Sequence, residues 1–220
     1  MTLGEIQERL IAWAGAQERQ PWLLAARASW FSRVGEPHDE DKSYEQRMNG
    51  LLEHYVFEWK PDGVRTTLEL FLRDGAEGLT TDERGQVRDL GRSLRSLFEV
   101  RKIGDGAVEL EDVLGDGRHT VVERRAVVAL AKGDLLEARL LPHDGKLHFS
   151  SASTYHPREV RKAILKEARR LQGTPGWGRA GVEEFLAQLS RMALSFERYR
   201  NVRVESIYDF EARPARSAEG

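Results

Sequence analysis

The densest group of metal-binding oxygen atoms in the sequence is the acidic run at residues 38–41. Asp39 and Asp41 carry carboxylates of the kind that bind Mg²⁺ or Mn²⁺ together with water. Consecutive loop residues point in different directions, however, and helical spacing fixes no second carboxylate pair nearby. We therefore interpret the run as a solvated acidic loop.

Three histidines and one carboxylate fall within fourteen positions farther along the chain: His143, Asp144, His148 and His156. Imidazole and carboxylate groups are ligands of zinc. We expect these residues in a turn, in a strand and at the start of a helix, so they do not converge. The sequence contains no HExxH motif either. We predict no bound metal and no cofactor.

Hydroxyl groups are concentrated just before the last of these histidines, at Ser150, Ser151, Ser153 and Thr154. A serine hydrolase places its nucleophile in a G-x-S-x-G turn between a strand and a helix, and this motif is absent. No GxGxxG motif leads from a strand into a helix, and no GxxxxGKS/T motif is present. We predict no catalytic residue and favour a protein that is not an enzyme.

Residues 158–171 have the period of a helix with one apolar face and one basic face. A basic face can contact the phosphates of a nucleic acid or an acidic protein surface. The plainer interpretation is a solvated face, partly neutralised by Glu159 and Glu167. The residues that would contact a nucleic acid are Arg158, Arg161, Lys162, Lys166, Arg169 and Arg170.

Two large apolar side chains accompany this basic face. Leu165 lies among the charges, and Trp177 stands between glycines in the segment that follows. Both are candidates for exposed anchors in a protein interface, although such a tryptophan more often pins its loop to the core. The predicted partner-binding residues are Arg158, Lys162, Leu165, Lys166, Arg169 and Trp177.

The elements that position these residues divide the chain into helical and β-prone parts. Before residue 96 the patterns are helical, and the pairs Thr2–Glu5, Ser43–Gln46 and Thr80–Glu83 have the spacing of helix N-terminal caps. The strongly apolar residues 22–34 predict a core helix or part of an oligomer interface.

Residues 96–153 change to short β-prone runs, and three of their connections carry Asp-Gly, which is typical of tight hairpins. We expect one helix from His156-Pro157 to Leu171 and another from Gly181 onward, with an apolar stripe that continues to Tyr199. The predicted fold class is α+β, with a helical N-terminal region, a small five-stranded antiparallel sheet or barrel, and two C-terminal helices. The expected units are residues 1–95, 96–153 and 154–210, followed by a disordered tail at 211–220.

Composition excludes several classes of protein. The 220 residues include no cysteine, which rules out a disulfide scaffold, a thiol nucleophile and a cysteine-ligated metal. The longest apolar run, Ala126–Ala131, is far shorter than the roughly 20 residues that span a bilayer. With no signal-peptide pattern at its start, the sequence predicts a cytoplasmic protein without a membrane partner.

Charge is distributed unevenly along the chain. The formal net charge is −2, which gives no overall attraction to nucleic acid. Residues 36–89 nevertheless carry 14 acidic and 7 basic side chains, whereas residues 158–203 carry 5 acidic and 11 basic ones. Such a split indicates oppositely charged faces that meet each other or two different partners.

Six short stretches within about residues 58–150 are EWKPDG (58–63), LELFL (68–72), GLTTDER (78–84), SLFEV (96–100), LEDVL (110–114) and GDLLEAR (133–139). They resemble a group of poorly characterised bacterial proteins, some of which carry a zinc-binding SEC-C motif elsewhere in the chain. The resemblance implies no enzyme activity. The SEC-C motif needs cysteine, so its zinc and its docking role do not carry over to this sequence.

The leading prediction from the sequence is a non-enzymatic cytoplasmic interaction or adaptor protein that binds another protein. The alternative is a nucleic-acid-binding protein that uses the basic C-terminal helices beside a small β-barrel. A metal-dependent enzyme is the third possibility. A homo-oligomer is compatible with the apolar helix expected at residues 22–34.

Overall fold

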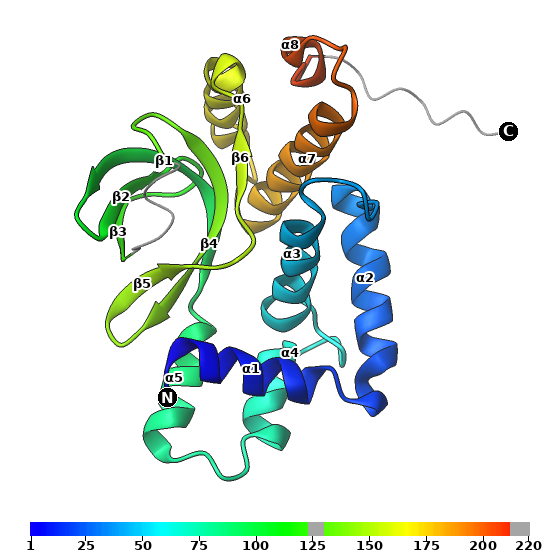
Figure 1. The fold of residues 1–220 in the computed structure, drawn as a ribbon, viewed down its shortest axis with the longest axis vertical. Helices are drawn as coiled ribbons and strands as arrows, with labels where there is room; N and C mark the ends of the chain where they lie inside the picture. The colour runs from blue at the N-terminus through cyan, green and yellow to red at the C-terminus, as the bar shows by residue number, and fades with distance from the viewer. Residues whose placement is uncertain (123–129, 212–220) are drawn as a thin grey trace, which may run out of the picture.

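The computed structural model describes residues 1–122 and 130–211. It has an α+β fold in which helices surround one side of a small β-barrel (Figure 1). The α-helices are α1 (Leu3–Ala14), α2 (Gln20–Val34), α3 (Tyr44–Phe57), α4 (Thr67–Leu70), α5 (Thr81–Leu90), α6 (Arg161–Gln172), α7 (Arg179–Arg198) and α8 (Val204–Ile207). Shorter turns are the 3₁₀ segments η1 (Gln17–Arg19) and η4 (Arg158–Val160) and the π-helical segment η2 (Phe71–Gly75). The strands are β1 (Leu94–Gly104), β2 (Ala107–Asp112), β3 (Arg118–Val122), β4 (Leu135–His143), β5 (Lys146–Phe149) and β6 (Thr154–His156).

The barrel closes in the order β1-β2-β3-β5-β4, with β4 paired back to β1. Its neighbouring strands are antiparallel except β3 and β5, which run parallel where Val121 faces Leu147. The expectation of an antiparallel module is therefore wrong at this pair. Five strands cannot alternate in direction all the way around a closed ring, so closure requires one parallel pair.

A sixth strand lies outside the barrel. β6 pairs with residues 135–137 of β4, on the same edge of β4 that β5 occupies at residues 140–143. His156 therefore ends a strand instead of opening a helix, and α6 begins only after Pro157 and the 3₁₀ turn η4. This corrects the expected helix start.

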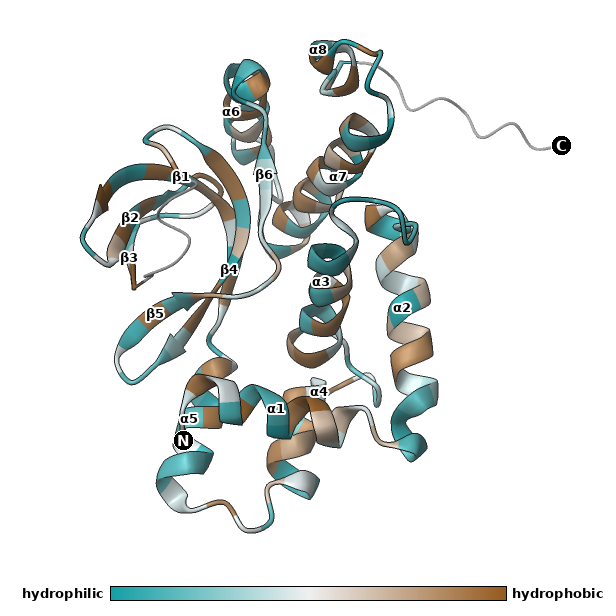
Figure 2. Ribbon diagram, in the orientation of Figure 1, coloured by the Kyte–Doolittle hydropathy of each residue, from teal (hydrophilic) through white to brown (hydrophobic). Residues whose placement is uncertain are grey.

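Alternation along β1 gives the barrel two apolar faces. Phe98 points into the barrel interior, which it fills with Leu110, Val121 and Leu140 among others. Leu97 points outward and joins a second core cluster with residues of α6 and α7. Figure 2 shows hydrophobic residues along β1 and β4, as this two-sided burial requires. The barrel and the helices therefore share core.

A third cluster joins α1, α3, α4 and α5 to Leu141 of β4, and a fourth packs α2 between α3 and α7. Trp30 and Phe31 are buried in the fourth cluster, so one side of α2 belongs to the core, whereas Leu24 on its other side is exposed. No helix in the described part of the chain is long and apolar enough to cross a membrane.

Helix caps follow the expected pattern with one exception. The capping boxes at Thr2 and Thr80 are present, together with one at Thr66. Ser43 does precede α3, but its hydroxyl makes no capping bond and contacts α7 instead. Most of the predicted apolar run at 126–131 and of the predicted tail at 211–220 lies outside the described residues.

Candidate functional site

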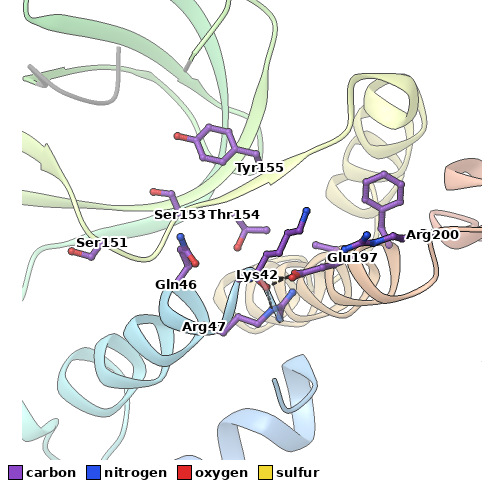
Figure 3. Close-up of a pocket in the computed structure, with 12 residues that line it drawn as sticks. Lys42, Gln46, Arg47, Ser151, Ser153, Thr154, Tyr155, Glu197 and Arg200 are labelled. Atoms are coloured by element: carbon purple, nitrogen blue, oxygen red, sulfur yellow. Dashed lines mark hydrogen bonds between the residues drawn. The ribbon is translucent and has the colours of Figure 1, made fainter. Parts of the chain in front are cut away.

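A groove of about 710 Å³ opens where the start of α3, the strand β6 and the end of α7 meet (Figure 3). Figure 3 shows Lys42 and Gln46 pointing from the α3 side toward the segment that carries Thr154 and Tyr155. The residues that line the groove are Lys42, Ser43, Gln46, Arg47, Ser151, Ser153, Thr154, Tyr155, Ala193, Phe196, Glu197 and Arg200.

The apolar stripe of α7 extends beyond the core, and its exposed end forms the apolar wall of the groove. Phe185 and Leu189 near the start of the stripe are at most 2% exposed. Phe196 and Tyr199 at its end are 39% and 60% exposed. Tyr155 of β6 is 47% exposed and lines the groove opposite α7. Large apolar side chains exposed beside a depression are typical of binding sites.

The charged groups of the groove differ in whether they have partners. Glu197 accepts hydrogen bonds from the Ser43 hydroxyl at 2.5 Å and from the Ser43 backbone N–H at 3.1 Å. Lys42 and Arg200 are exposed, and neither makes an ion pair or hydrogen bond within the described ranges. Glu197 thus already has hydrogen-bond partners, whereas the two cations at the rim have none in the described part of the chain. This arrangement favours an anionic ligand.

The acidic loop predicted at residues 38–41 is tied to the end of the same helix. Asp41 lies 2.6 Å from the Arg198 guanidinium, and its other contact is the backbone N–H of His38 at 2.7 Å. The hydrogen bond from Arg198 lowers the pKa of the Asp41 carboxyl to about 2. This carboxylate holds the loop that carries Lys42 against α7 and so shapes one end of the groove.

Arg47 forms the floor of the groove and is 8% exposed. Its Nε donates to the Ser43 hydroxyl and its Nη2 donates to the backbone carbonyl of Ser190, both at 3.0 Å. No carboxylate of residues 1–122 or 130–211 lies within 4.0 Å of its guanidinium. Burial lowers the pKa of Arg47, because a charge removed from water without a close counter-charge is disfavoured.

A small internal cavity of about 30 Å³ lies behind Arg47, and Gln46 and Thr154 line both it and the groove. Its inner wall contains an ion pair between Arg95 and Glu137, each less than 9% exposed. The Arg95 guanidinium also lies 4.8 Å from the centre of the Trp30 ring. Arg95 and Glu137 neutralise each other, so the inner wall is polar and already paired.

The basic face predicted on α6 is largely neutralised in the structure. Four of its six cations form ion pairs: Arg158–Asp134, Arg161–Glu99, Lys166–Glu211 and Arg170–Glu167. Lys162 and Arg169 make no ion pair within the described residues. None of these six side chains lines the groove. The structure therefore places the predicted interface away from the groove.

Leu165 and Trp177 are not exposed anchors, which corrects that expectation. Both are partly buried and pack against the core cluster shared by α6 and α7. The Trp177 ring lies on Gly181 so closely that a Cβ there would be 2.8 Å from it. The segment 176–181 (GWGRAG) has the spacing of GxGxxG, but it follows α6 and not a strand. Trp177 pins this turn to the core.

The candidate metal ligands do not converge. The rings of His143 and His148 lie 6.2 Å apart, whereas His156 is buried against the Tyr208 hydroxyl at 3.1 Å. Nowhere in the described chain do three or more possible metal-ligating side chains gather. The prediction of no metal stays a prediction.

Sequence reasoning missed the groove because its residues come from three distant segments. Its available signals were modest: the apolar stripe of α7 continues to Tyr199, and Tyr155 is a conspicuous aromatic residue next to the barrel. Arg47 gave no signal, since nothing in the sequence marks a helical arginine that becomes buried.

Comparison with known proteins gives a family but no activity. No curated protein matches the chain, and no solved structure matches it. A family model matches residues 31–188, a range that contains α3, the barrel and β6 and ends within α7. The chain therefore belongs to DUF7986, a family of unknown function.

Proposed function

We propose that this protein is a non-enzymatic interaction protein, and that its groove holds an acidic, extended segment of a partner protein. The observation that carries the proposal is the pairing of exposed aromatic rings, Tyr155 and Phe196, with the unpaired cations Lys42 and Arg200 around one groove. Aromatic residues and arginine are enriched in the parts of interfaces that contribute most binding energy.

The edge of β6 supports an extended peptide as the occupant. Among the described strands β6 pairs with β4 and no other, so no described strand lies along its second edge. Thr154 and Tyr155, neighbours in β6, both line the groove although successive side chains of a strand point to opposite faces. The strand therefore borders the groove with its edge, where a peptide backbone can add by β-augmentation.

The charges favour a protein segment over a nucleic acid. Stacking aromatic rings beside cations would also suit a single strand. A polyanion, however, needs several cations in a row, and this groove offers two on its rim with Glu197 in its wall. The basic face of α6, which would have extended the contact, is mostly paired with acidic residues.

A selection from a phage-displayed library of random peptides tests the proposal. We expect the full chain to enrich peptides that combine Asp or Glu with apolar residues. Affinity should fall at least about tenfold in the double variant Lys42→Glu/Arg200→Glu, since reversing both rim charges repels an acidic peptide. The matched control, Lys162→Glu/Arg169→Glu, makes the same change of charge on α6 and should bind as the wild type does.

Two outcomes would contradict the proposal. One is that no peptide is enriched, or that the groove and α6 variants lose affinity equally. The other is that a fluorescein-labelled mixed-sequence single-stranded DNA binds, with an affinity that falls steeply with salt and is lost in the groove variant. The second result would move nucleic-acid binding to first place.

A further inference from the structure

We infer that Arg47 is the receptor for one carboxylate of the bound segment, at the floor of the groove. The inference rests on the proposed function for the identity of the ligand, and on the buried, unpaired guanidinium for the site itself.

Arg47 differs from two other buried arginines in the partners of its guanidinium. Arg95 is 7% exposed and is paired with Glu137, and Arg139 is 2% exposed and contacts both Glu53 and Glu58. Arg47 is buried to the same degree, yet within residues 1–122 and 130–211 it has only neutral oxygen partners. Burying a charge without a counter-charge is costly, and the fold supplies a counter-charge to both of the others.

The surroundings of Arg47 suit a carboxylate that enters from the groove. Two of its nitrogens, Nε and Nη2, hold the side chain in place through Ser43 and the carbonyl of Ser190. Its remaining nitrogen, Nη1, makes no hydrogen bond to any described residue. Gln46 and Thr154 line both the groove and the internal cavity and add an amide and a hydroxyl that can donate to an anion.

The charges around the site favour a single carboxylate over a phosphate. Glu197 shares the groove and Glu137 the cavity behind it, and both act on Arg47 electrostatically. A group with one negative charge neutralises Arg47, whereas a second charge would face these carboxylates.

An NMR titration tests the anion site without needing a peptide. The Nε–Hε signal of Arg47 is identified in the ¹⁵N spectrum of the full chain by its loss in Arg47→Met, or in Arg47→Lys if the first variant does not fold. We expect sodium acetate to move this signal saturably, and sodium chloride of equal ionic strength not to do so. The Nε–Hε signal of Arg95, whose guanidinium is already paired, should stay in place. The variant Arg169→Met, which also removes one positive charge, should keep the acetate response.

An Arg47 signal that does not move with acetate, or moves equally with chloride, would overturn the inference. A response to inorganic phosphate without one to acetate would overturn the carboxylate as ligand and point to a phosphorylated partner.

A double-mutant cycle then connects the site to the peptide. Each acidic residue of a selected peptide is changed to its amide and measured against wild-type protein and Arg47→Met. At one position we expect the change to lower the affinity of the wild type at least about tenfold and that of Arg47→Met hardly at all. Losses that are independent of Arg47 at every position would leave the groove as the binding site and refute the role of Arg47. An acetate response without any selected peptide would refute the proposed function and leave the anion site in place.

Discussion

Two buried side chains, His156 and Tyr208, show how burial sets the protonation state of a group. Burial lowers the pKa of His156 to about 4, against a smaller opposing effect from Glu137 and a reinforcing one from Arg47. Burial also raises the pKa of Tyr208, whose hydroxyl lies 3.1 Å from His156 Nδ1. Both side chains are therefore neutral at pH 7, and the polar contact between them costs no charge burial.

The neutral state of His156 predicts a loss of stability in acid. The unfolded chain takes up this proton near pH 6.5, whereas the folded chain takes it up near pH 4. The stabilisation is complete above pH 6.5 and is lost as the pH falls toward 4. Between pH 7 and pH 5 the free energy of unfolding of the wild type should fall about 2 kcal/mol more than that of His156→Gln. Urea denaturation at the two pH values measures both, and equal losses would show that His156 is protonated in the folded protein.

The starts of the helices show where local sequence sets the structure and where a tertiary contact replaces the local one. At Thr2, Thr66 and Thr80 the hydroxyl accepts from the backbone of a glutamate three residues on. Ser43 has the same position before α3, but its hydroxyl donates to Glu197 of α7 and accepts from Arg47. The residue in the capping position therefore links α3 to α7 and does not cap α3.

The cap of α5 predicts a local stability effect. Thr80→Ala removes the side-chain acceptor of the capping box and should lower the free energy of unfolding by about 1 kcal/mol. Thr81→Ala, at the exposed first position of the same helix, should change it by less than about 0.5 kcal/mol. Chemical denaturation of the two variants measures the difference. Similar values for both would mean that α5 is held by its packing on β4 and not by its cap.

At the scale of the whole molecule, buried ion pairs and shared core join the barrel to the helices. Arg139 of β4 contacts Glu53 and Glu58 from α3 and its end, and its Nη1 donates to Ser93 at 3.1 Å. The acidic first half and the basic last part of the chain also meet, through Asp41 and Arg198. Such contacts make independent unfolding of the barrel unfavourable.

Arg139 should therefore control the stability of both parts together. Arg139→Met removes the shared cation of two mostly buried carboxylates, Glu53 and Glu58, and should lower the free energy of unfolding by about 3–5 kcal/mol. Arg179→Met, which removes a more exposed partner 3.5 Å from Glu58, should cost less than about 1 kcal/mol.

Tryptophan fluorescence reports the helical part, since all five tryptophans lie outside residues 94–156. Amide hydrogen exchange in β2 reports the barrel, and the two should lose stability in parallel. Protection of β2 that persists in Arg139→Met would show that the barrel is stable alone.

Local sequence patterns predicted the parts of the fold that depend on neighbours along the chain. Periodicity, capping boxes and Asp-Gly turns predicted the helices, the small β module and the α+β class, because each depends on residues a few positions apart. Closure of the barrel decided the parallel pairing of β3 with β5 and left β6 on the outer edge. Only the tertiary structure buried Arg47, paired Arg161 with Glu99 and brought Lys42, Tyr155 and Phe196 to one groove. These properties arise from contacts between residues about 40 to 150 positions apart, and a single sequence carries no local signal for such contacts.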